Sequence, residues 1–182
     1  LDPVRFLTNQ SSGKMGVSIA RIASFRGADV TLIYGKGTEP EPSDVNTIRV
    51  ETTEEMYDKV VEELEDDYNL IVAAAAPQDF TPEETSEKKV RRGEPQEIRL
   101  LPTPGILDKA SEISPNSYLV GFKAECNVTD EELVDAAKQK AEECNLNLVV
   151  ANDVMREGAG FGTDTNEVIF YYISGSEHIK AT

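Results

Sequence analysis

The sequence predicts an α/β fold: a three-layer, Rossmann-like arrangement of a mostly parallel sheet with helices on both faces. Strand-like and helix-like segments alternate along the 182 residues with short connections, which favours parallel pairing and right-handed crossovers. Segments 69–76 and 146–151 are almost wholly apolar, as is typical of central parallel strands. The length suits one core, so we expect a single domain over residues 1–182.

Helical spacing of apolar residues predicts the helices. In the first helix Met15, Ile19 and Ile22 share one face, and Gly27 predicts its end. Thr52 or Thr53 is a candidate cap for the second helix. The predicted helices cover residues 13–27, the segment from Thr52 or Thr53 through Leu64, 104–113 and 130–144.

Short apolar or β-branched runs predict the strands. They cover residues 4–7, 29–34, 46–50, 69–76, 118–124, 146–151 and 168–173, the last as a candidate edge strand. Residues 80–101 interrupt the alternation, because they are rich in Pro, Glu, Lys and Arg and are long for a connection. We expect this segment to leave the core as a flap, with two short strands around Arg92 and Gly93.

The composition excludes several classes of protein. A net charge of −16 argues against a nucleic-acid binder. No apolar run approaches the roughly 18 residues of a membrane helix, and no signal peptide opens the chain, so we expect a cytoplasmic protein without a membrane partner. One histidine, His178, argues against histidine-based catalysis. Cys126 and Cys144 lack metal-type spacing and are expected as free thiols.

Ligands of such sheets bind beyond the carboxyl ends of the strands, so the segments that follow strands are the candidate site. In residues 8–16 a serine, Ser11 or Ser12, can cap the helix, and Gly13 lets a ligand approach the backbone. Free N–H groups and the helix dipole make this turn an anion site, to which Lys14 can add charge. It is not a Walker phosphate loop, because Thr8 stands where that loop needs glycine. A capped helix without a ligand is an equal alternative.

The same segment, Asn-x-Ser-Ser-Gly-Lys-Met-Gly at 9–16, preceded by Asp-Pro-Val-Arg at 2–5, resembles a motif of the phosphopantothenoylcysteine synthetases. These enzymes often form the C-terminal half of a bifunctional coenzyme A biosynthesis protein. The resemblance continues along nearly the whole chain. Its further motifs are residues 27–33, 74–80, 89–92, 120–125, 151–153, and Gly160-Phe161-Gly162 with Asn166.

The resemblance implies a ligase. Family members activate the carboxylate of 4′-phosphopantothenate with a nucleoside triphosphate, release pyrophosphate, and couple the acyl-nucleotide to the amine of cysteine. The Ser-Ser-Gly-Lys-Met-Gly form favours CTP, carried with Mg²⁺, over ATP. The resemblance also implies a homodimer in which each flap reaches the partner's site, and a flavin-dependent decarboxylase domain that is fused or associated.

Residue roles follow from the same resemblance, and each has a structural alternative. Asn9 and Lys89 would be catalytic, Asn9 by holding the acyl-nucleotide and Lys89 by activating the nucleotide from the flap. Asp79 is a candidate ligand of the Mg²⁺ that accompanies the triphosphate. Predicted nucleotide contacts are Ser11, Ser12, Gly13, Ala75, Asp79, Phe80, Lys89 and Lys140. Predicted contacts with the acyl substrate are Arg5, Asn9, Ala76, Arg92 and Asn152. The alternatives are turn formation for Asn9, Asp79 and Asn152, an exposed ion pair for Arg5, strand packing for the alanines and a solvated charged face for the flap.

Several positions depart from the family's pattern. Arg91 and Arg92 stand where lysines are usual, Lys123 where alanine is usual, Cys144 where a second lysine is common, and Gly105 where aspartate is usual. We also expect a strand and a Gly-Gly-Thr turn before Asp2, and a helix after residue 182, in the complete protein.

Two other functions stay open. A non-catalytic nucleotide-binding module is favoured by Gly105 and Cys144. A nicotinamide-dependent oxidoreductase shares the fold class, but Gly-x-Gly-x-x-Gly is absent and no tyrosine has a lysine four residues on.

Overall fold

The computed structural model describes residues 1–93, 95–160, 163–173 and 177–181, the last range as backbone. Phe161 and Gly162, which belong to the last motif of the family resemblance, lie outside the described residues. Nowhere in the described ranges is there a helix both long enough and apolar enough to cross a membrane.

The four predicted helices are confirmed. They are α1 (Lys14–Phe25), α2 (Thr53–Glu63), α3 (Ile106–Ile113) and α4 (Asp130–Glu143). Thr52 caps α2 by accepting the Glu55 N–H, and Gly27 follows α1 with a φ of 90°. The prediction of a serine cap on α1 is wrong, because the cap residue is Gly13, whose φ of 80° an L-residue rarely adopts.

The main sheet is mixed and mostly parallel, as predicted. Its order is β3-β6-β7-β8-β9. The pairs β3–β6 and β6–β7 are parallel, and the pairs β7–β8 and β8–β9 are antiparallel. The bounds are β3 (Leu70–Ala73), β6 (Tyr118–Glu125), β7 (Leu148–Asp153), β8 (Val168–Tyr172) and β9 (Glu177–Ala181). The prediction of β8 as an edge strand is wrong, because β9 pairs along its outer side.

Other strand predictions need correction. β1 (Thr31–Tyr34) and β2 (Asn46–Arg49) form a parallel pair of their own, not hydrogen-bonded to the main sheet within the described residues. Residues 4–7 form no strand; Asp2 and Arg5 make an isolated bridge, and Val4 and Phe6 are exposed. The buried strand predicted over 69–76 is shorter and only half-buried, because within the described residues β3 pairs with β6 alone, and its first residue is exposed.

Helices lie on both faces of the main sheet. Since side chains alternate along a strand, Val149 and Ala151 of β7 pack in the core that α4 and α3 cover. Leu148 and Val150 face the other way, where α1 borders an apolar cleft of about 350 Å³. The cleft is lined by Met15, Ile19, Val72, Val120, Phe122, Leu148, Val150, Asn166, Val168 and Phe170.

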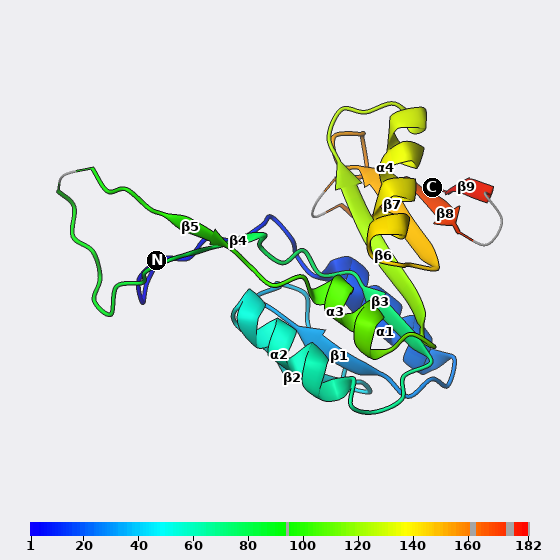
Figure 1. Ribbon diagram of the computed structural model, residues 1–182, viewed down its shortest axis with the longest axis horizontal. Coiled ribbons are helices and arrows are strands. Elements are labelled where there is room, and N and C mark those ends of the chain that lie inside the picture. The colour runs from blue at the N-terminus through cyan, green and yellow to red at the C-terminus, as the bar shows by residue number, and fades with distance from the viewer. Residues whose placement is uncertain (94, 161–162, 174–176, 182) are drawn as a thin grey trace.

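A long arm projects from this body (Figure 1). Its base is an antiparallel pair, β4 (Phe80–Pro82) and β5 (Leu100–Pro102), and the segment between them contains the residues expected to form the flap. The strands stand at the base and not around Arg92 and Gly93, where glycine and charged residues disfavour strand pairing. The N-terminal residues run beside the arm, and the Ser86 N–H donates to the Leu1 carbonyl over 3.0 Å.

Candidate functional site

The glycine turn, formed by Ser11, Ser12 and Gly13, leads directly into the N-terminus of α1, where an anion site is expected. The Ser12 hydroxyl lies 3.3 Å from the Lys14 N–H, and the Val17 N–H begins the helical ladder by donating to the Gly13 carbonyl. The first N–H groups of a helix have no partner within it, so those of α1 face outward beside Gly13. Ser11, Ser12 and Gly13 are half-buried. The N–H groups of Ser11 and Lys14 donate within the turn, to the Asn9 carbonyl and the Ser12 hydroxyl, whereas those of Ser12 and Gly13 make no hydrogen bond with the described residues.

Asn9 joins this turn to the segment after β3. Its side-chain amide donates to the carbonyls of Ala76 and Pro77, each over 3.1 Å, and its carbonyl accepts from the Gln78 amide over 3.2 Å. Two predicted site residues, Asn9 and Ala76, are thus in direct contact although 67 positions apart. Gln78 was not predicted, and its place beside Asp79 in the same motif is the only sequence signal for it.

The rest of that segment is open to solvent. Ala75, Asp79 and Phe80 are exposed. The Asp79 carbonyl accepts the Thr103 N–H over 2.9 Å, which ties the two ends of the arm together. The Asp79 carboxylate makes no hydrogen bond or ion pair with the described residues, so it can take a ligand.

Lys14 forms an ion pair with Asp164, 150 residues away. The hydrogen bond from the Lys14 ammonium lowers the pKa of Asp164 and raises its own. The pair brings residues 163–166 to the start of α1. Sequence reasoning missed Asp164, because nothing local connects it to the turn.

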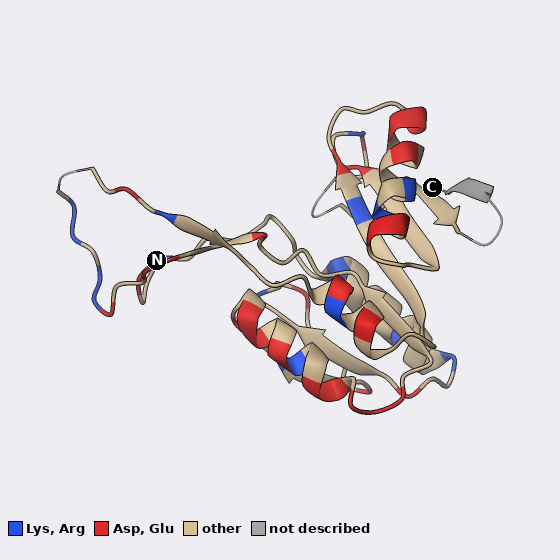
Figure 2. Ribbon diagram, in the orientation of Figure 1, with Lys and Arg blue, Asp and Glu red and all other residues tan. Residues whose placement is uncertain are grey.

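The predicted substrate residue Arg5 binds the arm. Its guanidinium pairs with Asp2 and donates to the Val90 carbonyl over 2.8 Å, while the Val90 N–H donates to Asp2. The Arg5 guanidinium holds the pKa of the Asp2 carboxyl well below its ordinary range. Lys89 and Arg92, on either side of this clamp, are exposed. The arm thus presents its basic residues from a fixed base (Figure 2).

Asn152 serves the loop that follows β7. Its amide donates to the Ala159 carbonyl over 3.2 Å and lies 3.4 Å from the Asn166 side-chain oxygen. Through Asp164 the same loop meets Lys14. Asn152 is therefore connected to the turn through the loop, with no direct contact among the described residues.

Lys140 lies apart from the glycine turn, in the last turn of α4. Two positions that depart from the family's pattern, Gly105 and Cys144, lie near this helix end. Burial raises the pKa of the Cys144 thiol, a hydrogen bond to Asp108 raises it further, and Lys140 opposes both. The Asp108 carboxylate also fills the space beside Gly105, since a Cβ there would lie 2.2 Å from its oxygen. Asp108 thus lies between the two departures, Gly105 and Cys144.

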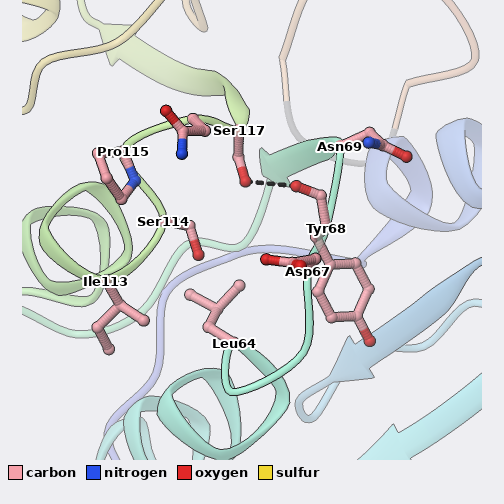
Figure 3. A pocket seen from close by; sticks show the side chains of 9 residues that line it. Leu64, Asp67, Tyr68, Asn69, Ile113, Ser114, Pro115 and Ser117 are labelled. Carbon is pink, nitrogen blue, oxygen red and sulfur yellow. Dashed lines mark hydrogen bonds between the residues drawn. The ribbon is translucent and has the colours of Figure 1, made fainter.

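A polar cavity of about 300 Å³ lies at the other end of the sheet (Figure 3). It is bordered by the residues just before β3 and β6, including Tyr68, whose carbonyl accepts the Ser117 hydroxyl. Parallel sheets bind ligands at the carboxyl ends of their strands, so this cavity lies away from the candidate site.

An α/β fold with a glycine turn at a helix N-terminus, and an arm that carries a basic cluster at residues 88–92, defines a class of protein, and comparison with known families shows which class this is. All 182 residues match the family described as DNA/pantothenate metabolism flavoprotein C-terminal domain, so the chain belongs to it. The resemblance found in the sequence is confirmed.

Particular relatives agree. The chain is 45% identical over 170 residues to the coenzyme A biosynthesis bifunctional protein CoaBC of Thermococcus kodakarensis, covering 93% of this chain and 41% of that protein. It thus spans less than half of that relative. A crystal structure of the C-terminal domain of a CoaBC protein is 32% identical with a TM-score of 0.78, covering 100% of this chain and 79% of that one. The DNA/pantothenate metabolism flavoprotein of Streptococcus pneumoniae is 25% identical with a TM-score of 0.83, covering 100% and 87%.

Proposed function

We propose that this chain is the phosphopantothenate–cysteine ligase domain of coenzyme A biosynthesis. It activates the carboxylate of 4′-phosphopantothenate with CTP, which forms an acyl-cytidylate and releases pyrophosphate. The cysteine amine then attacks the acyl carbon and CMP leaves. The observation that carries the proposal is the family match over the whole chain, supported by 45% identity to a protein named for coenzyme A biosynthesis.

The arrangement of the site suits this chemistry. The reaction brings two anionic substrates together, so catalysis rests on placement and on neutralising charge. In the proposal the N–H groups of Ser12 and Gly13 and the hydroxyl of Ser11 hold nucleotide phosphates, since the Ser11 N–H donates to the Asn9 carbonyl. Asn9 holds this turn against Ala76. Lys89 approaches the nucleotide from the arm and neutralises charge as pyrophosphate leaves.

The donor set fits magnesium that arrives with the triphosphate. No cluster of three or more acidic, histidine or cysteine side chains suited to a metal occurs in the described part of the chain. Mg²⁺ commonly takes one or two carboxylates, several waters and substrate phosphates, and the exposed Asp79 can supply one such carboxylate. Bound there, the ion would neutralise charge on the triphosphate.

A homodimer is part of the proposal, together with a single synthetase domain of three layers over residues 1–182, a cytoplasmic location and a fused or associated flavin-dependent decarboxylase. Exposed apolar side chains gather on the N-terminal segment and the base of the arm. They are Val4, Phe6, Leu7, Phe80, Ile98 and Leu100, each 43–59% exposed. Apolar groups in this number are typical of a protein interface, and a second protomer is the expected cover.

A non-catalytic nucleotide-binding module is the second candidate. The observation that favours it is Lys140, a predicted phosphate contact, which here interacts with the buried Cys144 thiol. Formation of the cysteine adduct distinguishes the two candidates, because only the ligase would form it.

The test is a reconstituted reaction of the full-length protein with 4′-phosphopantothenate, cysteine, Mg²⁺ and either CTP or ATP. Pyrophosphate release and product mass are followed for the wild type and for Lys89→Gln. We expect product with CTP, and a loss of about 100-fold or more in kcat for Lys89→Gln, because a group that stabilises transition-state charge is removed.

Lys88→Gln is the matched control, since Lys88 is an exposed neighbour on the same arm. It should keep kcat within about twofold, as surface substitutions usually do. Binding of CTP by a folded wild type that turns over neither nucleotide would replace the ligase with the binding module.

A further inference from the structure

Tyr34 lies buried beneath the glycine turn. It ends β1 and is 5% exposed. Its hydroxyl is 3.2 Å from the Ser12 carbonyl oxygen and 3.0 Å from that of Glu39, and its single proton can serve one of them at a time. Burial raises the pKa of Tyr34, so the hydroxyl keeps its proton at neutral pH.

The Ser12 carbonyl is held from the loop after β1. Besides the Tyr34 hydroxyl, it accepts the N–H of Thr38 over 2.9 Å and that of Glu39 over 3.2 Å. A peptide group is planar and trans, so the Gly13 N–H points opposite to the Ser12 carbonyl, away from this loop. The hydrogen bonds that hold the Ser12 carbonyl therefore set the direction of the Gly13 N–H.

The tyrosine ring also fills the space between two turns. A Cβ on Gly13 would lie 2.4 Å from the ring carbon Cε2, and one on Gly37 would lie 2.2 Å from the hydroxyl oxygen. On the ring face the Arg49 guanidinium lies 4.5 Å from the centroid and donates to the Gly35 carbonyl over 3.3 Å. The backbone at Gly13 and at Gly37 thus packs against the same Tyr34 side chain, and Arg49 packs on the ring of that side chain.

We propose that Tyr34 is a positioning residue for a substrate phosphate. By holding the Ser12 carbonyl it aims the Gly13 N–H, and with it the opening of α1, at the phosphate. This inference rests on the proposed function for the reaction itself. CTP and 4′-phosphopantothenate offer the same phosphate chemistry to these N–H groups, and the experiment distinguishes them.

The experiment compares Tyr34→Phe with Tyr68→Phe in the full-length protein. Tyr68 is the matched control, because its hydroxyl also has two partners, Thr31 at 3.2 Å and Glu63 at 2.6 Å, away from the turn. The KM values for CTP, 4′-phosphopantothenate and cysteine are measured with kcat and the denaturation midpoint. We expect Tyr34→Phe to raise the KM of one phosphate-bearing substrate about three- to tenfold, the effect of one lost hydrogen bond, and to leave that of cysteine unchanged. The substrate affected identifies the phosphate.

Gly37→Ala is a second variant, because its Cβ would lie 2.2 Å from the tyrosine hydroxyl oxygen and 2.7 Å from the Ser12 carbonyl oxygen, and so would disturb their contact without removing the hydroxyl. It should reproduce the same selective rise. Equal changes in all three KM values, or a loss of stability like that of Tyr68→Phe with no change in KM, would leave Tyr34 a structural residue only and overturn the inference. An inactive wild type would instead refute the proposed function.

Discussion

Asp153 shows what one carboxylate does at the end of β7. It is 4% exposed and accepts three backbone N–H groups, from Asn127 over 3.0 Å, Val128 over 3.1 Å and Met155 over 2.9 Å. Arg156 lies 3.7 Å away. These bonds, that from Met155 first, lower the pKa of Asp153 below its ordinary value of 3.8. Asp153 therefore joins the loops that follow β6 and β7.

The first prediction concerns Asp153→Asn. An amide offers one acceptor oxygen where the carboxylate offers two, so the variant should be less stable at pH 7. Because the folded pKa is depressed, the contribution of Asp153 is fully present above pH 3.8 and is lost as the pH falls through the lower folded value. The difference in urea midpoint between wild type and variant should hold from pH 7 to pH 5 and narrow below pH 4.

Asp135→Asn is the control, since Asp135 is exposed on α4. Its urea midpoint should follow that of the wild type at every pH. A constant gap between wild type and Asp153→Asn down to pH 3 would show that this carboxylate has no depressed pKa.

Among the residues of the site, those that lie within a sequence motif could be predicted. Asn9 precedes α1 and Ala76 follows β3, and they meet through a 3.1 Å hydrogen bond. Tyr34 and Asp164 were missed, because burial of a hydroxyl under a turn and an ion pair across 150 residues depend on tertiary packing. The roles of Lys89 and Lys140 stay predictions.

At the scale of elements, the helices were more predictable than the strands. Helix ends have local causes, such as the capping box in which Thr129 and Glu132 exchange side-chain-to-backbone bonds at the start of α4. The fate of a strand depends on its neighbours. An apolar run predicted over 69–76 became a four-residue strand that pairs with β6. Residues 4–7 formed no strand, since the Arg5 backbone pairs locally with Asp2.

The second prediction concerns this capping box. Thr129→Ala removes the side-chain oxygen that accepts the Glu132 N–H over 3.2 Å, leaving a helix donor without its partner. We expect the free energy of unfolding to fall by about 1 kcal/mol. Urea unfolding followed by circular dichroism measures it.

Thr85→Ala on the arm is the matched control, because Thr85 is exposed and outside any helix. It should leave the free energy of unfolding within about 0.5 kcal/mol of the wild type. A Thr129→Ala variant as stable as this control would show that α4 does not depend on its cap.

At the scale of the whole molecule, charge is unevenly divided (Figure 2). The net charge is −16, and α4 opens with Asp130, Glu131 and Glu132, while Lys88, Lys89, Arg91 and Arg92 lie on the arm. The basic cluster at residues 88–92 on an otherwise acidic chain suits attraction between protomers in the proposed dimer, and salt should weaken that part of the attraction.

The third prediction is that the protein is a dimer that Ile98→Glu combined with Leu100→Glu dissociates. Both side chains are partly exposed, at 49% and 43%, so the protomer should stay folded while its interface gains two charges. We expect the dimer dissociation constant to rise about 30-fold or more, as for loss of interface anchors. Sedimentation equilibrium measures it.

Phe25→Glu is the control, because Phe25 is 85% exposed at the end of α1, off the arm. It should dissociate no more readily than the wild type. A monomeric wild type, or a double variant that keeps its dimer, would refute an interface on the arm.

The contact between Lys14 and Asp164 also has a consequence for synthesis. At about 5 to 20 residues per second, the ribosome needs roughly 8 to 30 s to add the 150 residues that separate them. During that interval the start of α1 has already been made, but the acidic partner of its lysine has not. A nascent chain therefore carries the turn without this ion pair, and the contact can close only after Asp164 has been added.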